Sequence, residues 1–264
     1  MVVVLGIPLD ENSSYLQGAA SAPQYIRDAY HSTSSNYCTE SGHDLNKDNR
    51  WKDMDDLLLS PMPKAIAEIE QAIAGHLASG NTVLSLGGDH SVSYPVISAY
   101  SKKFANLNVL HIDAHSDLYH NFEDNPYSHA SPFARVMEEG RVKRLVQVGI
   151  RTHNPHQKAQ AEKFGVEIIE MKDWNDSKRF RFDGPLYVSL DLDALDPAFV
   201  PGVSHYEPGG FTTRQVLNII QHLEADLVGA DIVELNPARD INGMTAMVAA
   251  KFLKELLAKL IEHS

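Results

Sequence analysis

Three potential metal ligands occupy alternate positions near the middle of the chain. The stretch H-I-D-A-H-S-D-L-Y, residues 111–119, contains Asp113, His115 and Asp117 and continues an apolar run. In an extended chain, side chains at positions i, i+2 and i+4 point to one side. Two carboxylates and an imidazole that converge in this way repel or desolvate one another unless a cation lies among them. The pattern therefore predicts a cation site.

Two more clusters place polar side chains where apolar runs end. G-G-D-H-S at residues 87–91 contains His90, and its glycines allow a sharp turn and a close approach of the backbone. A turn followed by a capped helix explains that stretch nearly as well. S-L-D-L-D-A-L-D-P at residues 189–197 again has acidic side chains at i and i+2, in Asp191 and Asp193. Each cluster adds candidate ligands to the first.

The combined set has the composition of a centre for a borderline-hard metal ion. Oxygen-rich sites with some imidazole suit Mn²⁺, and the single cysteine, Cys38, leaves no thiolate set for a structural zinc site. The ligands exceed the needs of one four-coordinate ion, and bridging carboxylates would allow two ions that turn a shared water into hydroxide. The chain has no G-x-S-x-G elbow and no P-loop. Metal-assisted hydrolysis is the reaction class that the pattern indicates.

Two residues outside this set are candidates for chemistry. His129, in N-P-Y-S-H-A-S-P-F, is either a surface histidine or a catalytic one, and the sequence favours neither. Glu234, in D-I-V-E-L-N-P, follows an apolar run and is placed either to bind a cationic group or to form a cap or salt bridge.

The elements that must position these residues alternate along the chain. Short, continuously apolar runs are typical of strands that are buried on both faces of a parallel sheet. Such runs occupy residues 2–7, 82–86, 108–112, 144–148, 166–170, 186–190 and 227–233. Helical spacing of apolar residues occurs at 63–78, at 213–223 after a candidate N-cap in Thr212, and at 244–261. The polar segment 36–56 is expected to be an edge excursion or a loop. The alternation predicts an α/β fold, and ligands of such sheets bind beyond the carboxyl ends of the strands.

Length and charge narrow the class of protein further. The chain has 264 residues, a net charge of −12 and no apolar run near the ~20 residues that a membrane span requires. Acidic chains are poor general binders of nucleic acid, because phosphate contacts depend on Lys and Arg. The N-terminus lacks the basic region of a signal peptide. We expect one domain over residues 1–264, a cytoplasmic location, and no nucleic-acid or membrane partner.

The motifs, in their order and spacing, resemble those of the ureohydrolase family, the arginases and agmatinases. The resemblance runs from G-I-P-L-D near residue 6 to G-M-T-A-M-V-A-A at 243–250. The stretches Y-S-H-A-S at 127–131 and D-P-A-F-V-P-G-V-S-H-Y-E-P-G-G at 196–210 look most like plant-type arginases. The resemblance implies a three-layer α/β/α fold with a mostly parallel sheet of about eight strands. It also implies a homo-oligomer, a trimer or a hexamer.

The resemblance implies two manganese ions per subunit. Their ligands would be His90, Asp113, His115, Asp117, Asp191 and Asp193, with Asp113 and Asp191 bridging. A bridging hydroxide would attack the guanidinium carbon and release urea and an amine. Asp117 would help to move a proton, His129 would shuttle one toward the leaving amine, and Glu234 would pair with the guanidinium.

The substrate is less closely defined than the chemistry. Arginine, which gives ornithine and urea, is favoured, and agmatine, which gives putrescine and urea, is the close alternative. Formimidoylglutamate or another guanidino acid comes next. Arginine requires donors for its carboxylate, for which Asn121, Asn125 and Ser128, and also Tyr127 and Asn154, are candidates. The V-S-H-Y-E-P segment departs from the T-G-T-P type of many relatives, so His205 and Glu207 are candidates for the entrance.

The sequence leaves two hypotheses of other functional classes open. One is a non-catalytic relative that keeps the fold for binding or assembly, which the complete ligand set disfavours. The other is a deacetylase-like amide hydrolase with a single zinc ion, which would need fewer acidic ligands than this sequence offers.

Overall fold

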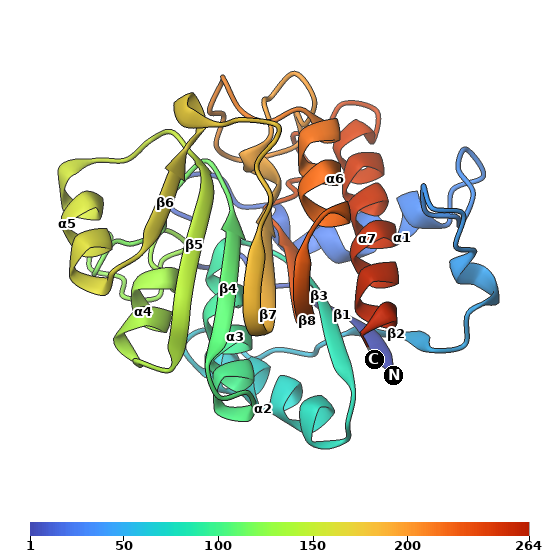
Figure 1. Cartoon of the computed structure of the whole chain (residues 1–264), viewed down its shortest axis with the longest axis horizontal. Helices are drawn as coiled ribbons and strands as arrows, with labels where there is room; N and C mark the ends of the chain where they lie inside the picture. The colour runs from blue at the N-terminus through green and yellow to red at the C-terminus, as the bar shows by residue number, and fades with distance from the viewer. Residues whose placement is uncertain (264) are drawn as a thin grey trace.

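Eight parallel strands form one sheet through the middle of the molecule (Figure 1). The structure is a computed structural model that describes residues 1–263. The strands are Val2–Ile7 (β1), Trp51–Asp56 (β2), Thr82–Gly87 (β3), Leu107–Ile112 (β4), Val142–Ile150 (β5), Glu167–Glu170 (β6), Arg181–Asp191 (β7) and Glu224–Val233 (β8). Their order across the sheet is β2-β1-β3-β8-β7-β4-β5-β6, and every neighbouring pair is parallel.

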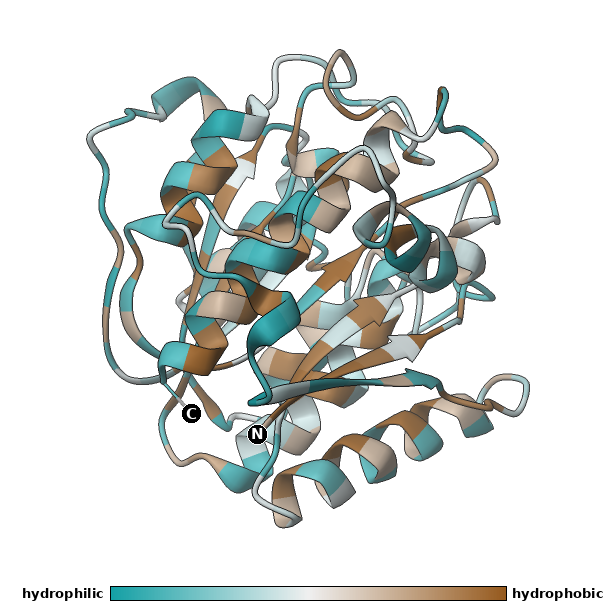
Figure 2. Cartoon of the chain, turned by 90° about the vertical axis from the view of Figure 1, so that its right-hand side faces the viewer, coloured by the Kyte–Doolittle hydropathy of each residue, from teal (hydrophilic) through white to brown (hydrophobic). Residues whose placement is uncertain are grey.

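Helices cover both faces of this sheet. They are Ala22–Tyr30 (α1), Lys64–Ala78 (α2), Ser93–Lys103 (α3), Pro132–Glu138 (α4), Pro155–Phe164 (α5), Thr213–Gln221 (α6) and Met244–Glu262 (α7). Buried side chains of α1, α6 and α7 pack in one core, and those of α2, α3, α4 and α5 pack in the other. Apolar residues gather in the strands, and hydrophilic ones lie on the outer sides of the helices (Figure 2). The expected three-layer α/β/α fold is confirmed.

The continuous apolar runs arise because each central strand contributes to both cores. In β1, Val2 and Val4 belong to the core under α1 and α7, whereas Val3 and Leu5 belong to the core under α2 and α3. Successive side chains of a strand point to opposite faces, so a strand that is covered on both faces has no polar alternation.

Most of the predicted elements are present. The apolar runs correspond to β1 and β3 to β8, and the helical patterns correspond to α2, α6 and α7. Thr212 caps α6, since its hydroxyl accepts from the Gln215 backbone and the Gln215 side chain accepts in return from the Thr212 backbone. The helices α1, α3, α4 and α5 were not predicted. Their apolar stripes are short, and Pro lies in the first turn of α1, α4 and α5.

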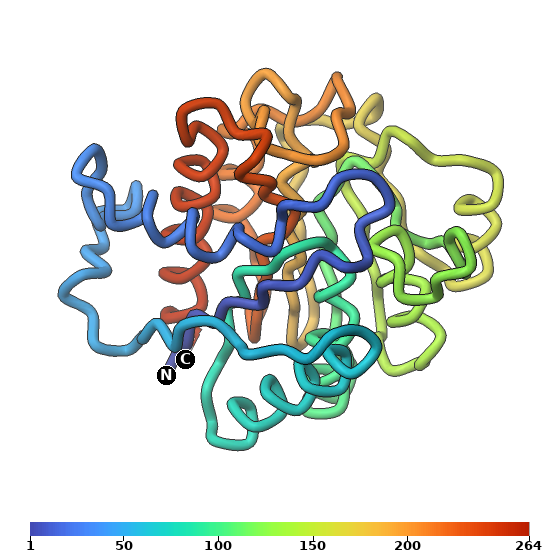
Figure 3. Tube along the Cα trace, turned by 180° about the vertical axis from the view of Figure 1, so that it is seen from behind, coloured from blue at the N-terminus to red at the C-terminus, as the bar shows by residue number. Residues whose placement is uncertain are grey.

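The polar segment 36–56 is partly ordered as a strand. Residues Trp51–Asp56 form β2 at the edge of the sheet, beside β1. Most of its residues are exposed, so the sequence lacks the apolar signal of a buried strand. The part before β2 extends from the body of the molecule beside α7 (Figure 3). The expectation of an edge excursion holds, and the alternative of a loop is wrong for β2.

Glu40 attaches this excursion to α6 and α7. Its two carboxylate oxygens each accept from Arg214 at 2.7 Å, and its backbone N–H donates to Glu255 at 2.9 Å. The hydrogen bonds from Arg214 and Gln221 lower the pKa of Glu40 to about 2. A carboxyl whose pKa is depressed in the folded state stabilises it above the ordinary pKa and loses that effect as pH falls.

We expect acid to release the excursion. Between the ordinary Glu pKa of 4.5 and about 2, the protection of residues 36–48 against amide hydrogen exchange, taken relative to an unstructured chain at the same pH, should fall in the wild type. Glu40→Gln should already show the lower protection at pH 7 and should lose little more of it in acid. Equal protection of both proteins at pH 7 would show that Glu40 does not hold the segment.

The described residues include no helix that combines the length and the apolar character needed to cross a bilayer.

Candidate metal centre

The register of the sheet brings the polar clusters to one level. Leu86 of β3 pairs with Ile232 of β8, Ile232 pairs with Leu190 of β7, and Leu190 pairs with Ile112 of β4. These four strands are neighbours at the centre of the sheet. These four paired residues form a row across the sheet, and each candidate cluster begins within a few residues after it. The clusters therefore meet at the edge of the sheet where the strands end.

Gly88 permits the closest approach at this edge. A Cβ atom there would lie 1.9 Å from the carbonyl oxygen of Leu9, so a larger residue would displace the exit of β1. The Glu234 N–H donates to the Gly88 carbonyl at 2.9 Å, and the His90 N–H donates to Oε1 of Glu234 at 2.8 Å. The glycine-rich turn thus sets His90 directly beside Glu234.

One group of ligand atoms surrounds Nδ1 of His90. This nitrogen lies 3.1 Å from a carboxylate oxygen of each of Asp113, Asp117 and Asp191. It is buried, and no described residue makes a hydrogen bond to it. An imidazole nitrogen and three carboxylate oxygens that face one another, with no hydrogen bond to the nitrogen, fit the coordination of a cation.

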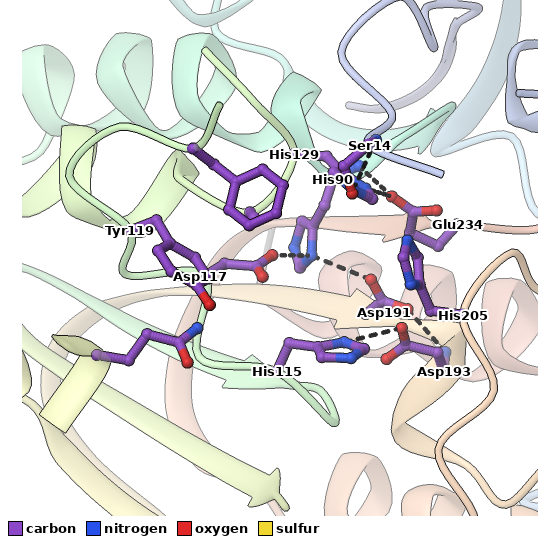
Figure 4. A pocket seen from close by; sticks show the side chains of 13 residues that line it. Ser14, His90, His115, Asp117, Tyr119, His129, Asp191, Asp193, His205 and Glu234 are labelled. Atoms are coloured by element: carbon purple, nitrogen blue, oxygen red, sulfur yellow. Dashed lines mark hydrogen bonds and ion pairs between the residues drawn. The ribbon is translucent and has the colours of Figure 1, made fainter. Parts of the chain in front are cut away.

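A second group surrounds Nδ1 of His115 (Figure 4). This nitrogen lies 3.0 Å from Oδ2 of Asp193 and 3.4 Å from Oδ1 of Asp113. The Asp193 N–H donates to Asp191 at 2.7 Å, which ties this group to the first. Asp113 presents one oxygen to each histidine. The structure therefore gathers the six predicted ligands into two adjoining groups that share Asp113.

The charges of the cluster favour a bound cation. Burial and the neighbouring carboxylates Asp193 and Asp113 raise the pKa of Asp191 well above its usual range. Burial likewise raises the pKa of Asp193 to about 6. Both shifts express the cost of packing anions together away from water. Divalent cations would remove this cost, so the residues fit a metal centre.

A buried hydrogen-bond chain sets the tautomer of His90. The Asp231 carboxyl group accepts from the Ser189 hydroxyl at 2.7 Å, from Ser93 at 2.8 Å and from Tyr187 at 2.9 Å. With its proton committed to Asp231, Ser189 accepts from Nε2 of His90 at 3.0 Å. The proton of His90 then lies on Nε2, and Nδ1 is free to coordinate a cation.

The convergence of Asp113, His115 and Asp117 is achieved in a different way from the one predicted. The three residues do not form an extended strand, because β4 ends at Ile112 and Asp117 has a φ of 48°. Glu234, at the end of β8, has a φ of 66°. Non-glycine residues rarely adopt this left-handed conformation, and strain of this kind is concentrated at functional sites.

A cavity of about 140 Å³ opens over the two groups. Its lining residues are Ser14, His90, His115, Asp117, Tyr119, Phe122, His129, Ala130, Gln157, Asp191, Asp193, His205 and Glu234. The structure thus places His129 and Glu234 in the cavity together with metal-ligand candidates. His129 is buried there, so the alternative of a surface histidine does not hold.

His129 connects Glu234 to the N-terminal loop. Its Nδ1 lies 2.8 Å from Oε1 of Glu234, and its Nε2 lies 2.7 Å from the Ser14 hydroxyl. Burial lowers the pKa of His129, but Glu234, Asp89 and Asp117 outweigh it and raise the pKa to about 9. The Ser14 N–H, 3.1 Å from Nε2, can donate only to an unprotonated nitrogen. Bound cations would lower the pKa of His129 again and favour this neutral form.

The expected donors from the 119–131 loop lie elsewhere. Asn121 is exposed, and Asn125 holds the loop by donating to Asn12 at 3.1 Å. Ser128 accepts from the Ala130 backbone at 3.3 Å. These residues, and Tyr127, do not belong to the lining of the cavity. Their assignment as substrate donors stays a prediction that the cavity lining does not support, because the path of an irregular loop decides which of its polar groups face inward.

Asn154, the remaining candidate donor for the substrate carboxylate, is the N-cap residue of α5. It caps α5, where its side chain accepts from the Gln157 backbone at 2.9 Å. In return, the Asn154 N–H donates to Oε1 of Gln157 at 3.3 Å. The structure thereby brings Gln157 to the cavity, a residue that sequence reasoning missed. The N-P-H-Q capping pattern was a local signal of that helix start.

The V-S-H-Y-E-P loop, residues 203–208, reaches the metal-ligand candidates. His205 lines the cavity, and its ring lies 5.3 Å from that of His129 and 5.8 Å from that of His115. Glu207 lies 3.9 Å from Nε2 of His115. Arg151 holds this loop against the ligand loop, because its guanidinium donates to the carbonyls of Glu207 and Asp193. The expectation for His205 and Glu207 agrees with their position.

Together, the fold and the site define an α/β protein with a buried cluster of His and Asp residues able to bind metal, beneath a cavity of a size for a small ligand. The sequence model of the Arginase family matches residues 1–258, and the chain belongs to that family, whose members are metal-dependent hydrolases of guanidino compounds.

Individual relatives agree with this assignment. Arginase 1, mitochondrial, of Arabidopsis thaliana is 46% identical over 97% of this chain and 80% of its own length. Agmatinase of Bacillus anthracis is 31% identical over 97% of this chain and 90% of its own length. The structure of arginase from Medicago truncatula superposes with a TM-score of 0.92 at 42% identity, covering 98% of this chain and 87% of that one.

The expected cytoplasmic location is contradicted by these relatives. The arginase of Arabidopsis is mitochondrial by its name, and a second one from the same plant is chloroplastic or mitochondrial. The expectation drew on composition and on the first residues of the chain, and neither reports the compartment in which a catalytic domain works.

Proposed function

We propose that the protein hydrolyses the guanidino group of arginine to give ornithine and urea. The observation that supports this most strongly is the pair of ligand groups that share Asp113 beneath a cavity containing Glu234. Agmatine, which would give putrescine and urea, is the alternative substrate. Formimidoylglutamate or another guanidino acid is less favoured as the substrate.

The proposed cofactor is two manganese ions per chain. His90, Asp113, Asp117 and Asp191 would hold one, and Asp113, His115, Asp191 and Asp193 would hold the other. When bound, such ions supply Lewis acidity and lower the pKa of a water molecule. The oxygen-rich, thiolate-free donor set supports manganese over a structural zinc ion.

The residues of the chain itself would bind the substrate and move protons. Glu234, buried and with Oε1 already accepting two hydrogen bonds, has Oε2 left to accept from the guanidinium. Asp117 faces His90 and the cavity, where it can accept a proton from the attacking water. His129 would hand a proton to the leaving amine while its bond to Glu234 fixes the ring. We further propose that residues 1–264 act as one domain and that the chain assembles as a homo-oligomer, a trimer or a hexamer.

The choice of substrate can be tested by urea release. Protein loaded with manganese would be offered arginine and agmatine separately at equal concentrations. Urea from arginine, with little from agmatine, is the expected result. Urea from agmatine alone would replace arginine as the substrate and leave the metal chemistry intact. Urea from neither compound would overturn the proposed activity.

Gln157 is the position at which the two substrates should be distinguished. Its Oε1 accepts from Asn154, which leaves its Nε2 free of partners among residues 1–263 and suited to an anionic group. Gln157→Glu keeps the acceptor that caps α5 but replaces the donor by a second negative oxygen. The KM for arginine should rise roughly tenfold, about 1.4 kcal/mol, and that for agmatine should not rise. An equal rise for both substrates would exclude contact between Gln157 and the carboxylate.

A further inference from the structure

His111 lies among the ligand candidates and has no assigned role. Its Nε2 lies 2.7 Å from Oδ2 of Asp113, and its side chain is fully buried. By position alone it could join His90, Asp113 and Asp117 around an ion, because one ligand atom of each lies within 4.8 Å of the others. The hydrogen bonds of its other nitrogen decide whether it does.

Gln147 determines where His111 carries its proton. Gln147 is the partner of His111 in the register of β5 against β4. Its Nε2 lies 2.6 Å from the Ser116 carbonyl oxygen, which can only accept. The opposite orientation of the amide would set two oxygens against each other, so the nitrogen must face Ser116.

The same amide nitrogen lies 2.9 Å from Nδ1 of His111. It donates its second hydrogen there, so Nδ1 carries a lone pair and the neutral ring carries its hydrogen on Nε2. That hydrogen points to Oδ2 of Asp113. Nε2 therefore has no lone pair to give to a metal ion. Phe133 stacks on the His111 ring, with centroids 3.8 Å apart and planes 26° apart, and holds the ring in place.

We propose that Gln147 and His111 are positioning residues that aim the Asp113 carboxylate at both metal ions. His111 donates to Oδ2, and the His115 backbone N–H donates to Oδ1 at 2.6 Å. These two donors fix the plane of the carboxylate so that one oxygen faces His90 and the other faces His115. The inference rests on the proposed metal centre, and it excludes His111 as a ligand.

Gln147→Glu provides the test. A carboxylate accepts from Nδ1 but cannot donate to it, so the neutral His111 ring would carry its hydrogen on Nδ1 and lose the bond to Asp113. We expect manganese affinity, measured by competition with a chelator, to fall at least about tenfold, within the range for partners that orient a ligand. Gln160→Glu, the same change at a buried glutamine of α5, should keep the wild-type affinity. Wild-type affinity in Gln147→Glu would overturn the proposal.

A second measurement does not depend on metal binding or on the folding of a variant. In the metal-free wild type with ¹⁵N-labelled histidine, ring NMR correlations should place the His111 hydrogen on Nε2. A hydrogen on Nδ1 would overturn the proposal. If the wild type bound no manganese and released no urea, the proposed function would fail, while the tautomer would still report on Gln147.

Discussion

Asp191→Asn is expected to be more stable than the wild type when both proteins are free of metal, and less stabilised when manganese is added. Burial, Asp193 and Asp113 raise the pKa of Asp191 in the folded protein. A carboxyl with a raised pKa stabilises the fold below its ordinary value and weakens it as pH rises. The advantage of the variant should therefore grow from pH 4 to pH 8. At pH 8 the free energy of unfolding of the variant should exceed that of the wild type by about 1–3 kcal/mol, the usual cost of a buried polar group without a partner.

The matched control is Asp196→Asn, five residues along the same segment. Amide donors at Ala198 and Gly209 lower the pKa of Asp196, so the same substitution there should destabilise the protein above pH 4. Thermal unfolding of the metal-free proteins between pH 4 and pH 8 measures both effects. A metal-free Asp191→Asn protein that is less stable than the wild type at pH 8 would show that the cluster needs no cation to offset its charge.

Glu234→Gln is expected to keep two manganese ions and to lose most of its turnover. The amide oxygen can still accept from the His90 backbone, so the ligand loop keeps its place. The substituted side chain loses the negative charge that pairs with the guanidinium. A hydrogen bond to a charged group contributes about 1.5–3 kcal/mol, so kcat/KM should fall roughly 10- to 150-fold. The kcat/KM of Glu234→Ala should be lower still, because this substitution also leaves the His90 N–H without its acceptor.

Two measurements on the same samples check this prediction. Metal analysis should give the wild-type manganese content, and urea release should give the loss of kcat/KM. Glu138→Gln, at an exposed carboxylate paired with Arg135 outside the cavity, should keep both values. Full activity in Glu234→Gln would remove the carboxylate from the mechanism, and loss of metal would make its role structural.

The parts of the site that the sequence predicts are those attached to strand ends. Asp113, Asp191 and Glu234 each lie within one residue of the end of a buried apolar run, and the register of a parallel sheet then brings them together. The loop donors were not predictable in this way. Asn121, Asn125 and Ser128 are polar like any loop residues, and only the three-dimensional path shows that Gln157 and Ser14 line the cavity instead.

Polar residues inside strands were the signal that was overlooked. His111, Gln147 and Asp231 interrupt buried runs of β4, β5 and β8, where a polar side chain is costly unless it has partners. Each of the three makes buried hydrogen bonds that lead to a ligand candidate. The edge strand β2 was missed for the opposite reason, because it is held by backbone pairing with β1 and has little apolar character.

The central claim, a two-metal hydrolase of arginine, is tested most directly by titrating metal-free protein with manganese and following urea release from arginine. Turnover should be negligible without metal and should rise until two equivalents per chain are bound. The Asp193→Ala and His115→Ala proteins should reach a lower metal content and almost no turnover at any manganese concentration. Full turnover without metal, or saturation at one equivalent with no further gain, would contradict the account.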